Sequence, residues 1–504
     1  MIRMLPISYI VKPGDSLYSI SRKFGTTIKR IKEYNNLESN MIYPGQKLYI
    51  TAIFYTVQPG DSLYSIAKLL NTTVKSIVKL NNLNSIILLI GKPLKIPFYT
   101  EVVVGVNNGN IRSGPGKQYP VVAKMSKKAR LPVVAVRGKW YKVRLFNGDI
   151  GWISDSIVQF KTYGARKPIS SILGYYTTEE GPQLPSSYDS FVNNKYNISE
   201  LGLFMFRIDP KDPTQIEKFG EFTDQYVKNL VFIAHTNNIK IMPTVHNLLY
   251  KNGGTELARE LVSQMVSTKQ NRQTFINSVI ALIEKYNFDG VNMDIEDVNI
   301  EDSENLTKFY TELGRRLHQK GYYVSAALPS RISDKPFNPF SDPFDYERIG
   351  EALDEAVIML YNEHGWPGSG PGPVVSIGWM ERVINYTVTK IDREKIVAAV
   401  SVFGFDFNLT TGKNNYVTYS KAVDLAKKYN KEIIFDEKTQ TPTFSYTDEN
   451  GNEHEVWFED TRSIKAKIKK AYELGIKGVA LWRLGMEDPK IWDMIQSDIV
   501  VSKK

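Results

Sequence analysis

The sequence predicts a multidomain protein with two small βααβ modules, a small all-β barrel, and a larger α/β barrel that carries a small α+β insertion. Three observations predict this organisation. A repeat with an offset of 46 residues fills the first 97 positions, and short β-like runs follow over residues 101–158. From about residue 169, eight strand-like runs alternate with amphipathic helical stretches. Such alternation favours a parallel sheet, and eight units favour a closed (β/α)8 barrel.

The composition is that of ordinary globular domains. The chain has 504 residues, of which 42% are hydrophobic and 23% charged, which is enough for several folded units. No apolar run approaches the length of a membrane span. Cysteine is absent, which excludes disulfides, thiolate nucleophiles and cysteine-based metal sites. The five histidines show no metal-ligand spacing, and we expect neither a metal nor another cofactor.

The net charge of +10 is unevenly distributed along the chain. Residues 1–97 hold 13 Lys and Arg against 4 Asp and Glu, and residues 98–160 hold 10 against 3. The remainder is mildly acidic. A basic front suggests contact with an anionic polymer, either bacterial wall or nucleic acid, although an ordinary solvated lysine-rich surface has the same composition. No nucleic-acid-binding motif accompanies the charge, so we expect no nucleic-acid partner.

The repeat consists of two modules, residues 8–51 and 54–97. The segment Tyr9–Ile20 reads YIVKPGDSLYSI and returns as YTVQPGDSLYSI at Tyr55–Ile66. In each copy a short strand ends at Pro-Gly, two helices follow, and a second strand closes the module. We expect the Asp-Ser pairs at positions 15–16 and 61–62 to cap the first helix of each copy.

Both copies resemble LysM domains through the Pro-Gly-Asp-Ser-Leu-Tyr-Ser-Ile segment, the Asn-Asn-Leu and the late Gly-x-x-Leu-x-Ile. LysM domains bind polymers of N-acetylglucosamine such as peptidoglycan and chitin. The resemblance implies a groove between the Gly-Asp-Ser-Leu turn and the loop before the last strand. The alternative for these residues is a structural role, as core leucines and capping aspartates. The implied glycan-binding residues are Asp15, Ser16, Leu17 and Ile42 in the first copy, with Asp61, Ser62, Leu63 and Leu88 in the second.

Residues 101–158 contain short β runs, among them a segment Asn-Ile-Arg-Ser-Gly-Pro at 110–115 and a Gly-Trp-Ile at 151–153. These pieces resemble a bacterial SH3 domain. Such domains dock on wall peptides or on neighbouring domains. Trp140 and Trp152 could line a binding cleft, but half-buried core aromatics are the simpler interpretation.

Residues 169–504 are expected to form the (β/α)8 barrel. The segment from about 408 to 458 is too long for a βα loop and carries β-like pieces, so we expect it to be the α+β insertion before the eighth strand. The eight expected strands are Ile172–Tyr175, Leu201–Phe206, Lys240–Val245, Gly290–Glu296, Tyr323–Leu328, Ala356–Tyr361, Ile396–Phe403 and Gly478–Trp482.

The fourth strand carries the most informative residues. Three apolar side chains, at 291, 293 and 295, alternate with Asn292, Asp294 and Glu296, so the polar side chains share one face. Burying an amide beside two carboxylates is costly unless they bond each other or a ligand. Neighbouring carboxylates split their proton affinities, which can keep one of them protonated at neutral pH. A salt-bridged structural strand is disfavoured because none of the three inward positions is Lys or Arg.

Function in such a barrel is concentrated at the carboxyl ends of the strands. An acidic pair, several aromatic residues and some amides gather there, which fits a sugar site because aromatic faces stack on pyranose rings and polar groups bind hydroxyls. No glycine-rich turn with Lys or Arg suggests a phosphate site. The strand-end residues are Tyr175, Phe206, His246, Asn247, Asp294, Glu296, Tyr361, Phe405, Asp406 and Trp482.

Asp289–Glu296, which reads DGVNMDIE, resembles the Asp-Gly-x-Asp-x-Asp-x-Glu signature of family 18 glycoside hydrolases. Met359-Leu-Tyr361 and Trp482 match further motifs of that family. The segments WFED at 457–460 and WRLG at 482–485 are similar to the branch that contains spore cortex-lytic N-acetylglucosaminidases. Members of that branch likewise carry tandem LysM modules and no signal peptide. The SH3-like segment is absent from its simplest members.

The resemblance implies a mechanism in which the substrate's own acetamido oxygen attacks the anomeric carbon, an exception among retaining glycosidases. Glu296 would be the general acid and base, and Asp294 would orient the acetamide and stabilise the oxazolinium. Tyr361 would position the same acetamide, and Trp482 would stack under the sugar. Asp289 would brace the strand from below. The other implied substrate-binding residues are Asn292, Tyr175, His246, Asn247, Asn362 and Asp406.

Two positions depart from the family pattern. Asn292 stands where the family has an aspartate that shares a proton with its neighbour, and an amide can bond Asp294 but cannot take that proton. A changed pH profile is therefore expected. After Tyr361, where many members have an acid, this chain has Asn362 followed by Glu363. Either of the two could reach the substrate.

The sequence favours a wall-targeted β-N-acetylglucosaminidase that acts on peptidoglycan, with spore cortex as one form of it. A chitinase is the rival among enzymes, and a chitinase-like lectin that binds without cutting is the rival outside them. The first residues lack the apolar segment of a secretory signal. The expected location is the spore coat, cortex or cell wall after cytoplasmic synthesis, with a simple cytosolic protein as the alternative.

Overall fold

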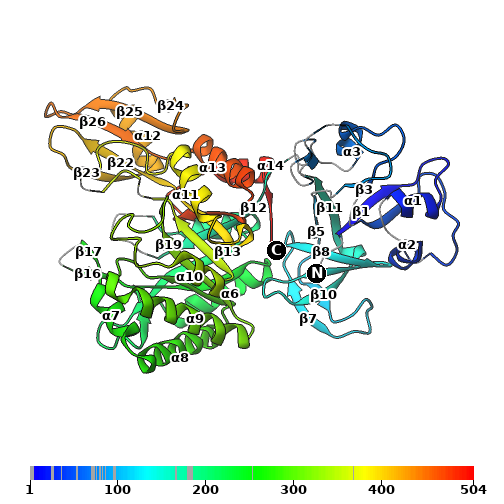
Figure 1. The fold of residues 1–504 in the computed structure, drawn as a ribbon, viewed down its shortest axis with the longest axis horizontal. Helices are drawn as coiled ribbons and strands as arrows, with labels where there is room; N and C mark the ends of the chain where they lie inside the picture. Colours follow the sequence, from blue (N-terminus) through cyan, green and yellow to red (C-terminus); the bar gives the residue numbers. More distant parts are fainter. Residues whose placement is uncertain are drawn as a thin grey trace. The chain divides into compact units, whose positions relative to one another are not determined.

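The computed structural model describes residues 5–23, 28–35, 37–52, 55–69, 74, 77–78, 81, 83, 85, 87–94, 98–164, 167–178, 185–251, 254–361, 363–366 and 368–503. The chain forms two compact units, one essentially residues 1–169 and the other essentially residues 170–501 (Figure 1). Each unit has hydrophobic cores of its own. Within the described ranges, no helix is both long enough and apolar enough to cross a bilayer.

The first repeat has the predicted βααβ order. Strand β1 (Leu5–Ile10) is followed by helices α1 (Leu17–Lys23) and α2 (Ile28–Asn35) and by strand β2 (Lys47–Ala52). The two strands pair antiparallel along their whole length. Asn35, from the Asn-Asn-Leu motif, fastens α2 to β2, because its side-chain amide donates to the carbonyl of Tyr49 and its oxygen accepts from the N–H of Tyr49.

The cap of each module is the serine of the predicted Asp-Ser pair. Ser16, and not Asp15, caps α1, because Ser16 and Ser19 exchange hydrogen bonds between backbone N–H and side-chain oxygen at 2.9 and 3.1 Å. Asp15 instead accepts from the Tyr9 hydroxyl at 2.7 Å and from the N–H of Lys12 at 2.8 Å, which ties the Pro-Gly turn to β1.

The second repeat reproduces these contacts. Ser62 and Ser65 form the same reciprocal cap on α3 (Leu63–Leu69), and Asp61 accepts from the Tyr55 hydroxyl. Strand β3 (Tyr55–Thr56) pairs with β4 (Pro93–Leu94). The second helix expected in this copy falls largely outside the described residues.

The SH3-like segment is a seven-stranded antiparallel sheet in the order β11-β5-β8-β9-β10-β6-β7. Its core consists mainly of Val, Ile and Leu residues that alternate along the strands, together with Met125, Ala129 and Tyr141. Trp140 and Trp152 are half-buried and lie outside that core cluster. The strands are β5 (Phe98–Val104), β6 (Gly109–Arg112), β7 (Val121–Met125), β8 (Arg130–Arg137), β9 (Trp140–Arg144), β10 (Ile150–Ser154) and β11 (Val158–Gly164).

The second unit is the predicted eight-stranded parallel barrel. Each strand pairs with the next, and the ring closes because β12 pairs with both β13 and β27. All eight strands lie where the alternating pattern predicted them, within a few residues at each end. They are β12 (Ile169–Tyr176), β13 (Glu200–Ile208), β15 (Lys240–His246), β18 (Gly290–Asp294), β19 (Tyr323–Pro329), β20 (Glu355–Met359), β21 (Ile396–Ser401) and β27 (Gly478–Trp482).

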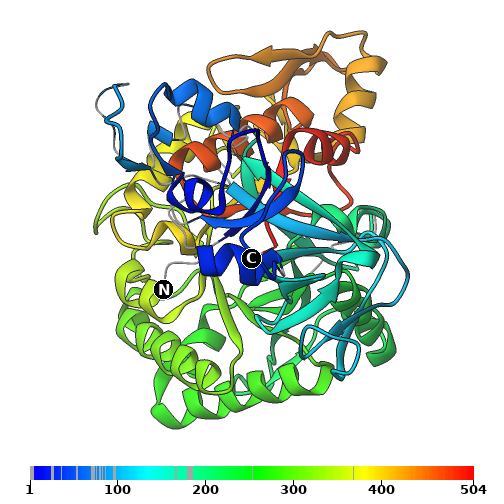
Figure 2. The ribbon, with the colours of Figure 1, turned by 90° about the vertical axis from the view of Figure 1, so that its right-hand side faces the viewer.

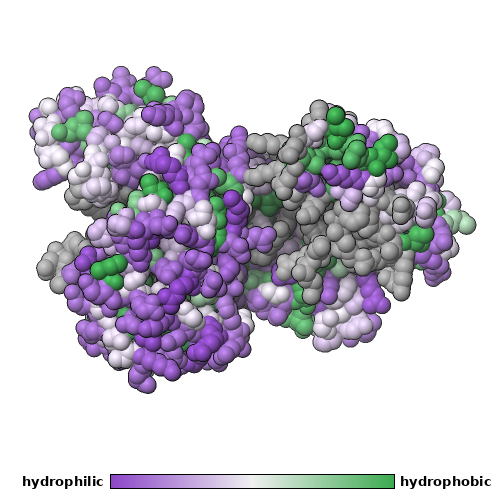
Figure 3. Space-filling model, in the orientation of Figure 1, coloured by the Kyte–Doolittle hydropathy of each residue, from purple (hydrophilic) through white to green (hydrophobic). Residues whose placement is uncertain are grey.

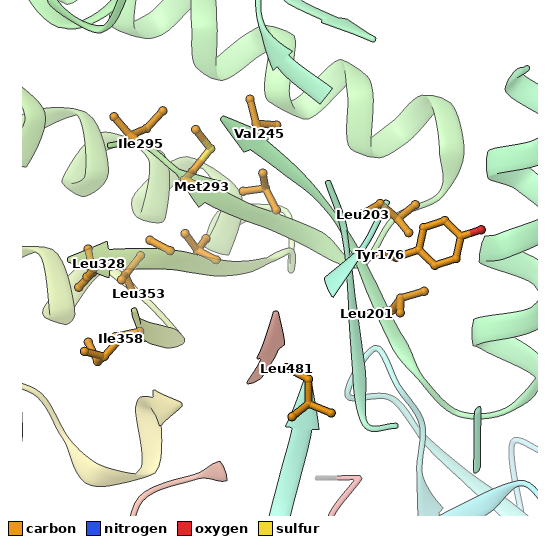
Figure 4. Packing of buried hydrophobic residues seen from close by; sticks show 14 of the residues in the cluster. Tyr176, Leu201, Leu203, Val245, Met293, Ile295, Leu328, Leu353, Ile358 and Leu481 are labelled. Carbon is orange, nitrogen blue, oxygen red and sulfur yellow. The ribbon is translucent and has the colours of Figure 1, made fainter. Parts of the chain in front are cut away.

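Two hydrophobic clusters hold the barrel together. The larger one lies between the strands and the surrounding helices, and Figure 4 shows among its members Val245 and Met293 on neighbouring strands and Ile295 just beyond the end of β18. A smaller cluster, which includes Tyr175 and Val397, fills the interior of the barrel. The alternation along β18 therefore points its apolar side chains outward, as the sequence predicted. The main helices are α6 (Asp224–Thr236), α7 (Arg259–Ser267), α8 (Lys269–Tyr286), α9 (Ser303–Gln319), α10 (Tyr346–Ala352), α11 (Ile377–Thr387), α13 (Thr461–Leu474) and α14 (Ile491–Asp498).

The insertion begins at Phe403, five residues before the start predicted from the sequence. A strand over 396–403 was expected, but β21 ends at Ser401 and the alternating aromatics Phe403, Phe405 and Phe407 open a separate sheet. The insertion has its own core and projects from the barrel in both ribbon views (Figures 1 and 2). Its elements are β22 (Phe403–Asn408), β23 (Asn414–Thr418), α12 (Tyr419–Lys428), β24 (Ile434–Asp436), β25 (Thr441–Thr447) and β26 (Glu453–Trp457).

Candidate active site

Strand β18 is anchored at its start by the Asp-Gly pair. The Asp289 carboxylate accepts from the N–H of Ile241 at 2.7 Å, which braces β18 against β15 from below. Gly290 must be glycine, because a Cβ there would lie 1.9 Å from the carbonyl oxygen of Tyr323. Both residues set the register that carries Asn292 and Asp294 up the inner face of the barrel.

Asp294 and Glu296 lie at the carboxyl end of this strand. Asp294 is 6% exposed and ends β18, whereas Glu296 lies just beyond the strand with part of its surface accessible. Burial raises the pKa of Glu296 well above its usual value, and the charges of Asp294 and then Asp297 raise it further. A carboxyl group with a raised pKa keeps its proton to higher pH than an ordinary glutamate does, which is what a general acid requires.

Asn292 is fully buried, and its side chain is held from three sides. Its oxygen accepts from the hydroxyls of Tyr175 (3.2 Å) and Thr244 (3.3 Å), and its nitrogen donates to the hydroxyl of Ser325 at 2.8 Å. Ser325 in turn donates to Glu355 at 3.0 Å. The amide at the family's aspartate position is therefore oriented by neighbouring strands and connected through Ser325 to a buried carboxylate.

Aromatic side chains surround the acidic pair. The indole of Trp482, at the end of β27, meets the ring of Tyr175 edge-on at 5.1 Å and that of Phe204 at 4.9 Å between centroids. Tyr361 lies 6.3 Å from Trp482 between ring centroids and is partly exposed. Burial raises the pKa of the Tyr175 phenol well above its usual value, with Asp294 the next cause, so Tyr175 remains a neutral donor. The predicted residues Tyr175, Tyr361 and Trp482 are thus brought together.

His246 belongs to the same aromatic group. Its ring stacks on Phe204 with centroids 3.9 Å apart, and its Cα is the register partner of Asp294 on the neighbouring strand. Burial, followed by the charge of Arg207, lowers the pKa of His246 well below its usual value. Nδ1 accepts from the N–H of Leu248 at 3.1 Å, so the neutral ring carries its proton on Nε2. His246 is a neutral group of the site floor and not a general acid.

Asn247 is not placed as a substrate contact. It is completely buried, and its side-chain amide forms hydrogen bonds with both the N–H and the carbonyl of Glu296. The sequence could not distinguish this role, because strand-end position alone does not say whether an amide faces the ligand or the protein.

Asp406 is likewise not a substrate contact in this structure. It lies on β22 of the insertion, where its carboxylate accepts from the Tyr446 hydroxyl at 2.8 Å and lies 2.7 Å from Nδ1 of His454. The prediction followed from extending the seventh barrel strand too far. Asn362 falls outside the described residues. Glu363 is held by the N–H of Ser376 at 2.8 Å.

The predicted glycan contacts of the repeats divide into two groups. Leu17 and Leu63 are core residues, 2% and 4% exposed, and the aspartates and serines make the turn and cap bonds described above. The exposed apolar surface of the first repeat includes Met41 beside the half-buried Ile42, and that of the second includes Ile87 beside the half-buried Leu88. The structural alternative therefore accounts for six of the eight predicted residues.

Phe204, Thr244 and Ser325 contribute to the site but were not singled out from the sequence. Each lies on a strand adjacent to β18 or beside Trp482, and the alternation of inward positions could have indicated them once the strand register was known. Among the described residues, no group of three or more His, Cys, Asp or Glu side chains could hold a metal ion.

Comparison with known protein families gives three matches that follow the structural divisions. Residues 172–487 match Glycosyl hydrolases family 18, residues 9–51 and 55–97 match the LysM domain, and residues 107–159 match the bacterial SH3 domain. The first of these covers the barrel together with its insertion.

The chain is similar to bacterial proteins whose names refer to cortex lysis or to sporulation. It is 32% identical to the cortical fragment-lytic enzyme of Bacillus anthracis over 298 residues, which span 58% of this chain and 65% of that relative. The putative sporulation-specific glycosylase YdhD of Bacillus subtilis is 27% identical over 94% of both chains. The crystal structure of the Bacillus cereus spore cortex-lytic enzyme SleL superposes with a TM-score of 0.61 at 26% identity, covering 99% of this chain and 100% of that one.

Proposed function

The chain belongs to glycosyl hydrolase family 18, and from that premise we propose that it is a glycosidase that cleaves β-1,4 bonds next to N-acetylglucosamine in peptidoglycan, including spore cortex. The observation that carries the proposal is the placement of Glu296 beside Asp294 at the carboxyl end of β18, where burial and then the charge of Asp294 raise the pKa of Glu296 well above its usual value. A site of this kind can protonate a glycosidic oxygen at neutral pH.

The proposed mechanism is retaining and substrate-assisted. Glu296 gives its proton to the glycosidic oxygen as the bond to the anomeric carbon breaks, and the acetamido oxygen of the same sugar attacks that carbon from the opposite face. The resulting oxazolinium carries a positive charge that Asp294 stabilises. Water then opens the ring after Glu296 has taken its proton.

The aromatic residues would hold the sugar during these steps. Trp482, flanked by Tyr175 and Phe204, provides a flat apolar surface of the kind on which pyranose rings stack. Tyr361 is partly exposed beside it, and on this proposal its hydroxyl donates to the acetamide. The neutral His246 contributes a polar edge to the floor of the site.

Peptidoglycan is the substrate that the rest of the chain supports. The basic charge of the first 160 residues complements an acidic wall polymer, and two LysM modules on one chain raise the effective concentration of the catalytic unit on a repeating glycan. The relatives named for cortex lysis and sporulation support the same choice. On this proposal the protein works at the spore cortex or cell wall.

The proposal is tested by mass spectrometry of fragments released from purified cortex peptidoglycan by the full chain. Fragments with N-acetylglucosamine at the reducing end are expected, because that sugar supplies the attacking acetamide. Fragments that end in muramic acid, or no fragments at all, would refute the assignment of the bond.

A chitinase is the second candidate, since the chain is 26% identical to a class V chitinase of Medicago truncatula over half of its length. Faster release of product from chitin oligomers than from cortex would favour it. A non-catalytic lectin is disfavoured, because the chain has a glutamate at position 296 in surroundings that raise its pKa.

The amide at position 292 gives a further prediction. Asn292→Asp introduces a carboxylate beside Asp294, and added negative charge raises the pKa of neighbouring acids. The alkaline limb of the kcat/KM profile, which reports deprotonation of Glu296, is expected to move up by roughly one pH unit. Asn292→Ser, which adds no charge, is the matched control. An unchanged profile in the aspartate variant would show that position 292 does not act on Glu296.

A further inference from the structure

A hairpin follows the third barrel strand and is closed at its base by two residues. Strands β16 (Leu248–Lys251) and β17 (Gly254–Leu257) pair antiparallel between Asn247 and Ala258. The N–H of Ala258 donates to the carbonyl of Asn247 at 3.0 Å, and the Asn247 side chain donates back to the carbonyl of Ala258 at 3.5 Å. The hairpin is thus a closed loop whose two ends are fastened to each other.

The same asparagine holds the backbone of Glu296. Its side-chain oxygen accepts from the N–H of Glu296 at 3.0 Å, and its nitrogen donates to the carbonyl of Glu296 at 2.9 Å. A backbone group of a neighbouring strand would bond in the same way, so Asn247 continues the β-sheet pairing beyond the point where β18 ends at Asp294. Because Asn247 is completely buried, this pair of bonds does not compete with water.

A second contact holds the residue after Glu296. Asp297 adopts a left-handed backbone conformation with φ of +53°, which is uncommon outside glycine. Arg259, at the start of α7, donates to both oxygens of its carboxylate at 2.8 and 2.6 Å. Bidentate pairs of this kind fix geometry as well as charge. The two contacts to the loop come from either end of the same hairpin.

We propose that Asn247 and the Arg259–Asp297 ion pair are positioning residues that clamp Glu296 from both ends of the β16–β17 hairpin. This inference rests on the proposed function of Glu296 as the acid and base. None of the three residues Asn247, Arg259 and Asp297 touches the reacting atoms. They fix the direction of the Glu296 side chain, and the ion pair also controls how much of the Asp297 charge that side chain meets.

The charges around Glu296 give the clamp an electrostatic consequence. Asp294 and Asp297 flank it on its own segment, Arg259 lies behind Asp297, neutral His246 stands beside Asp294 on β15, and the neutral phenol of Tyr175 faces it from β12. Asp297 favours the protonated form of Glu296, and Arg259 offsets part of that effect. Removing either partner should therefore move the alkaline limb of activity, and in opposite directions.

The test compares the kcat/KM profiles of Asp297→Asn and Arg259→Gln in the full chain. Loss of the Asp297 charge lowers the proton affinity of Glu296, so the alkaline limb should move to lower pH. Loss of Arg259 leaves Asp297 uncompensated, so the limb should move to higher pH. Arg259→Lys keeps the charge and should return the limb toward its original position. Shifts in the same direction, or none, would overturn the ion-pair part of the proposal.

Asn247→Ala tests the backbone part. A displacement of Glu296 should lower kcat by about 10- to 100-fold with little change in KM, since a misplacement of about 1 Å has an effect of that size. Asn247→Asp, which can accept from the N–H of Glu296 but cannot donate to its carbonyl, should be intermediate or equal in effect. An unchanged kcat in the alanine variant would exclude positioning by Asn247.

Arg348→Gln is the matched control for the ion pair. Arg348, which is as exposed as Arg259, makes a bidentate pair with the more exposed Glu304 between helices α10 and α9, and its removal should leave the pH profile unchanged. NMR titration of the Glu296 carboxyl, assigned by its absence in Glu296→Gln, separates this proposal from the proposed function. If the protein cleaves no glycan, the function fails, yet opposite shifts of the Glu296 titration in the two charge variants would still support the ion pair.

Discussion

Glu296→Gln is expected to lower kcat on cortex peptidoglycan by about 10²–10⁴-fold, because general acid–base catalysis contributes an effect of that size. Glutamine has nearly the same shape as protonated glutamic acid, so the hydrogen bonds of the backbone to Asn247 remain. It can neither give a proton to the leaving oxygen nor take one from water. Release of reducing ends from purified cortex measures the loss directly.

Binding separates a catalytic defect from a folding defect in this variant. Sedimentation with insoluble peptidoglycan should be equal for wild type and Glu296→Gln, because the LysM modules, which we propose bind the wall, lie elsewhere in the chain. Glu260→Gln, at an exposed position of α7, makes the same chemical change outside the site and should retain full activity. Wild-type turnover by Glu296→Gln would remove the general acid from the mechanism.

The parts of the molecule that the sequence predicted well are those encoded by local patterns. The period-two alternation through Val291 and Met293 predicted both the strand and which of its faces is apolar, since a strand's side chains alternate whatever surrounds it. The exact return of the Pro-Gly-Asp-Ser segment predicted two equivalent modules. The acid pair at 294 and 296 followed from the same alternation combined with the end of the strand.

The parts that the sequence did not predict depend on partners far away along the chain. Asn247 has a side chain of the kind that binds sugar hydroxyls, and only its hydrogen bonds to the backbone of Glu296 show that it supports the acid instead. In the sequence, Asp406 resembles an acid at the end of a barrel strand, but in the structure its carboxylate is bonded to Tyr446 and His454 of the insertion. The aspartate and serine at 15–16 are both good capping residues. The Tyr9 hydroxyl donates to the Asp15 carboxylate, so the serine is left to cap the helix. Such choices are made by packing and not by propensity.

A buried ion network underneath the site gives the second large prediction. Lys477 donates to Glu200 at 2.6 Å, to the Tyr323 hydroxyl at 2.9 Å, and to Glu355. Both glutamates are almost completely buried, and Glu355 is the carboxylate that Ser325 connects to the site. Lys477 therefore bonds two acids that have little access to water, and the charge of Lys240 acts on the same two acids.

Lys477→Met is expected to destabilise the barrel by about 3–5 kcal/mol, because removing one partner of a buried ion pair leaves uncompensated charge in the protein interior. Pulse proteolysis in urea measures this change, with the amount of a protease-resistant fragment that contains the barrel as the readout. Lys465→Met breaks an exposed pair with Asp498 and should cost less than about 1 kcal/mol. A comparable small loss for Lys477→Met would mean that Glu200 and Glu355 find other compensation.

The destabilisation should also depend on pH, and the direction follows from the two glutamates. In the wild type, burial and then Glu200 raise the pKa of Glu355 to about 7, whereas for Glu200 the two lysines outweigh burial and lower the pKa to about 2. Glu355 therefore adds stability below about pH 4.5 that is lost as the pH rises toward 7, and Glu200 adds stability above about pH 4.5 that is lost toward pH 2.

Without Lys477, burial raises the pKa of both groups, so both prefer the protonated form. Lys477→Met should then be most destabilising at pH 8 and partly relieved at pH 5, where the buried carboxyls can take up protons. Ser325 connects Glu355 to Asn292 by hydrogen bonds, so the protonation state of Glu355 also affects the floor of the active site. The glycosidase activity that this variant retains should therefore be greatest at acidic pH.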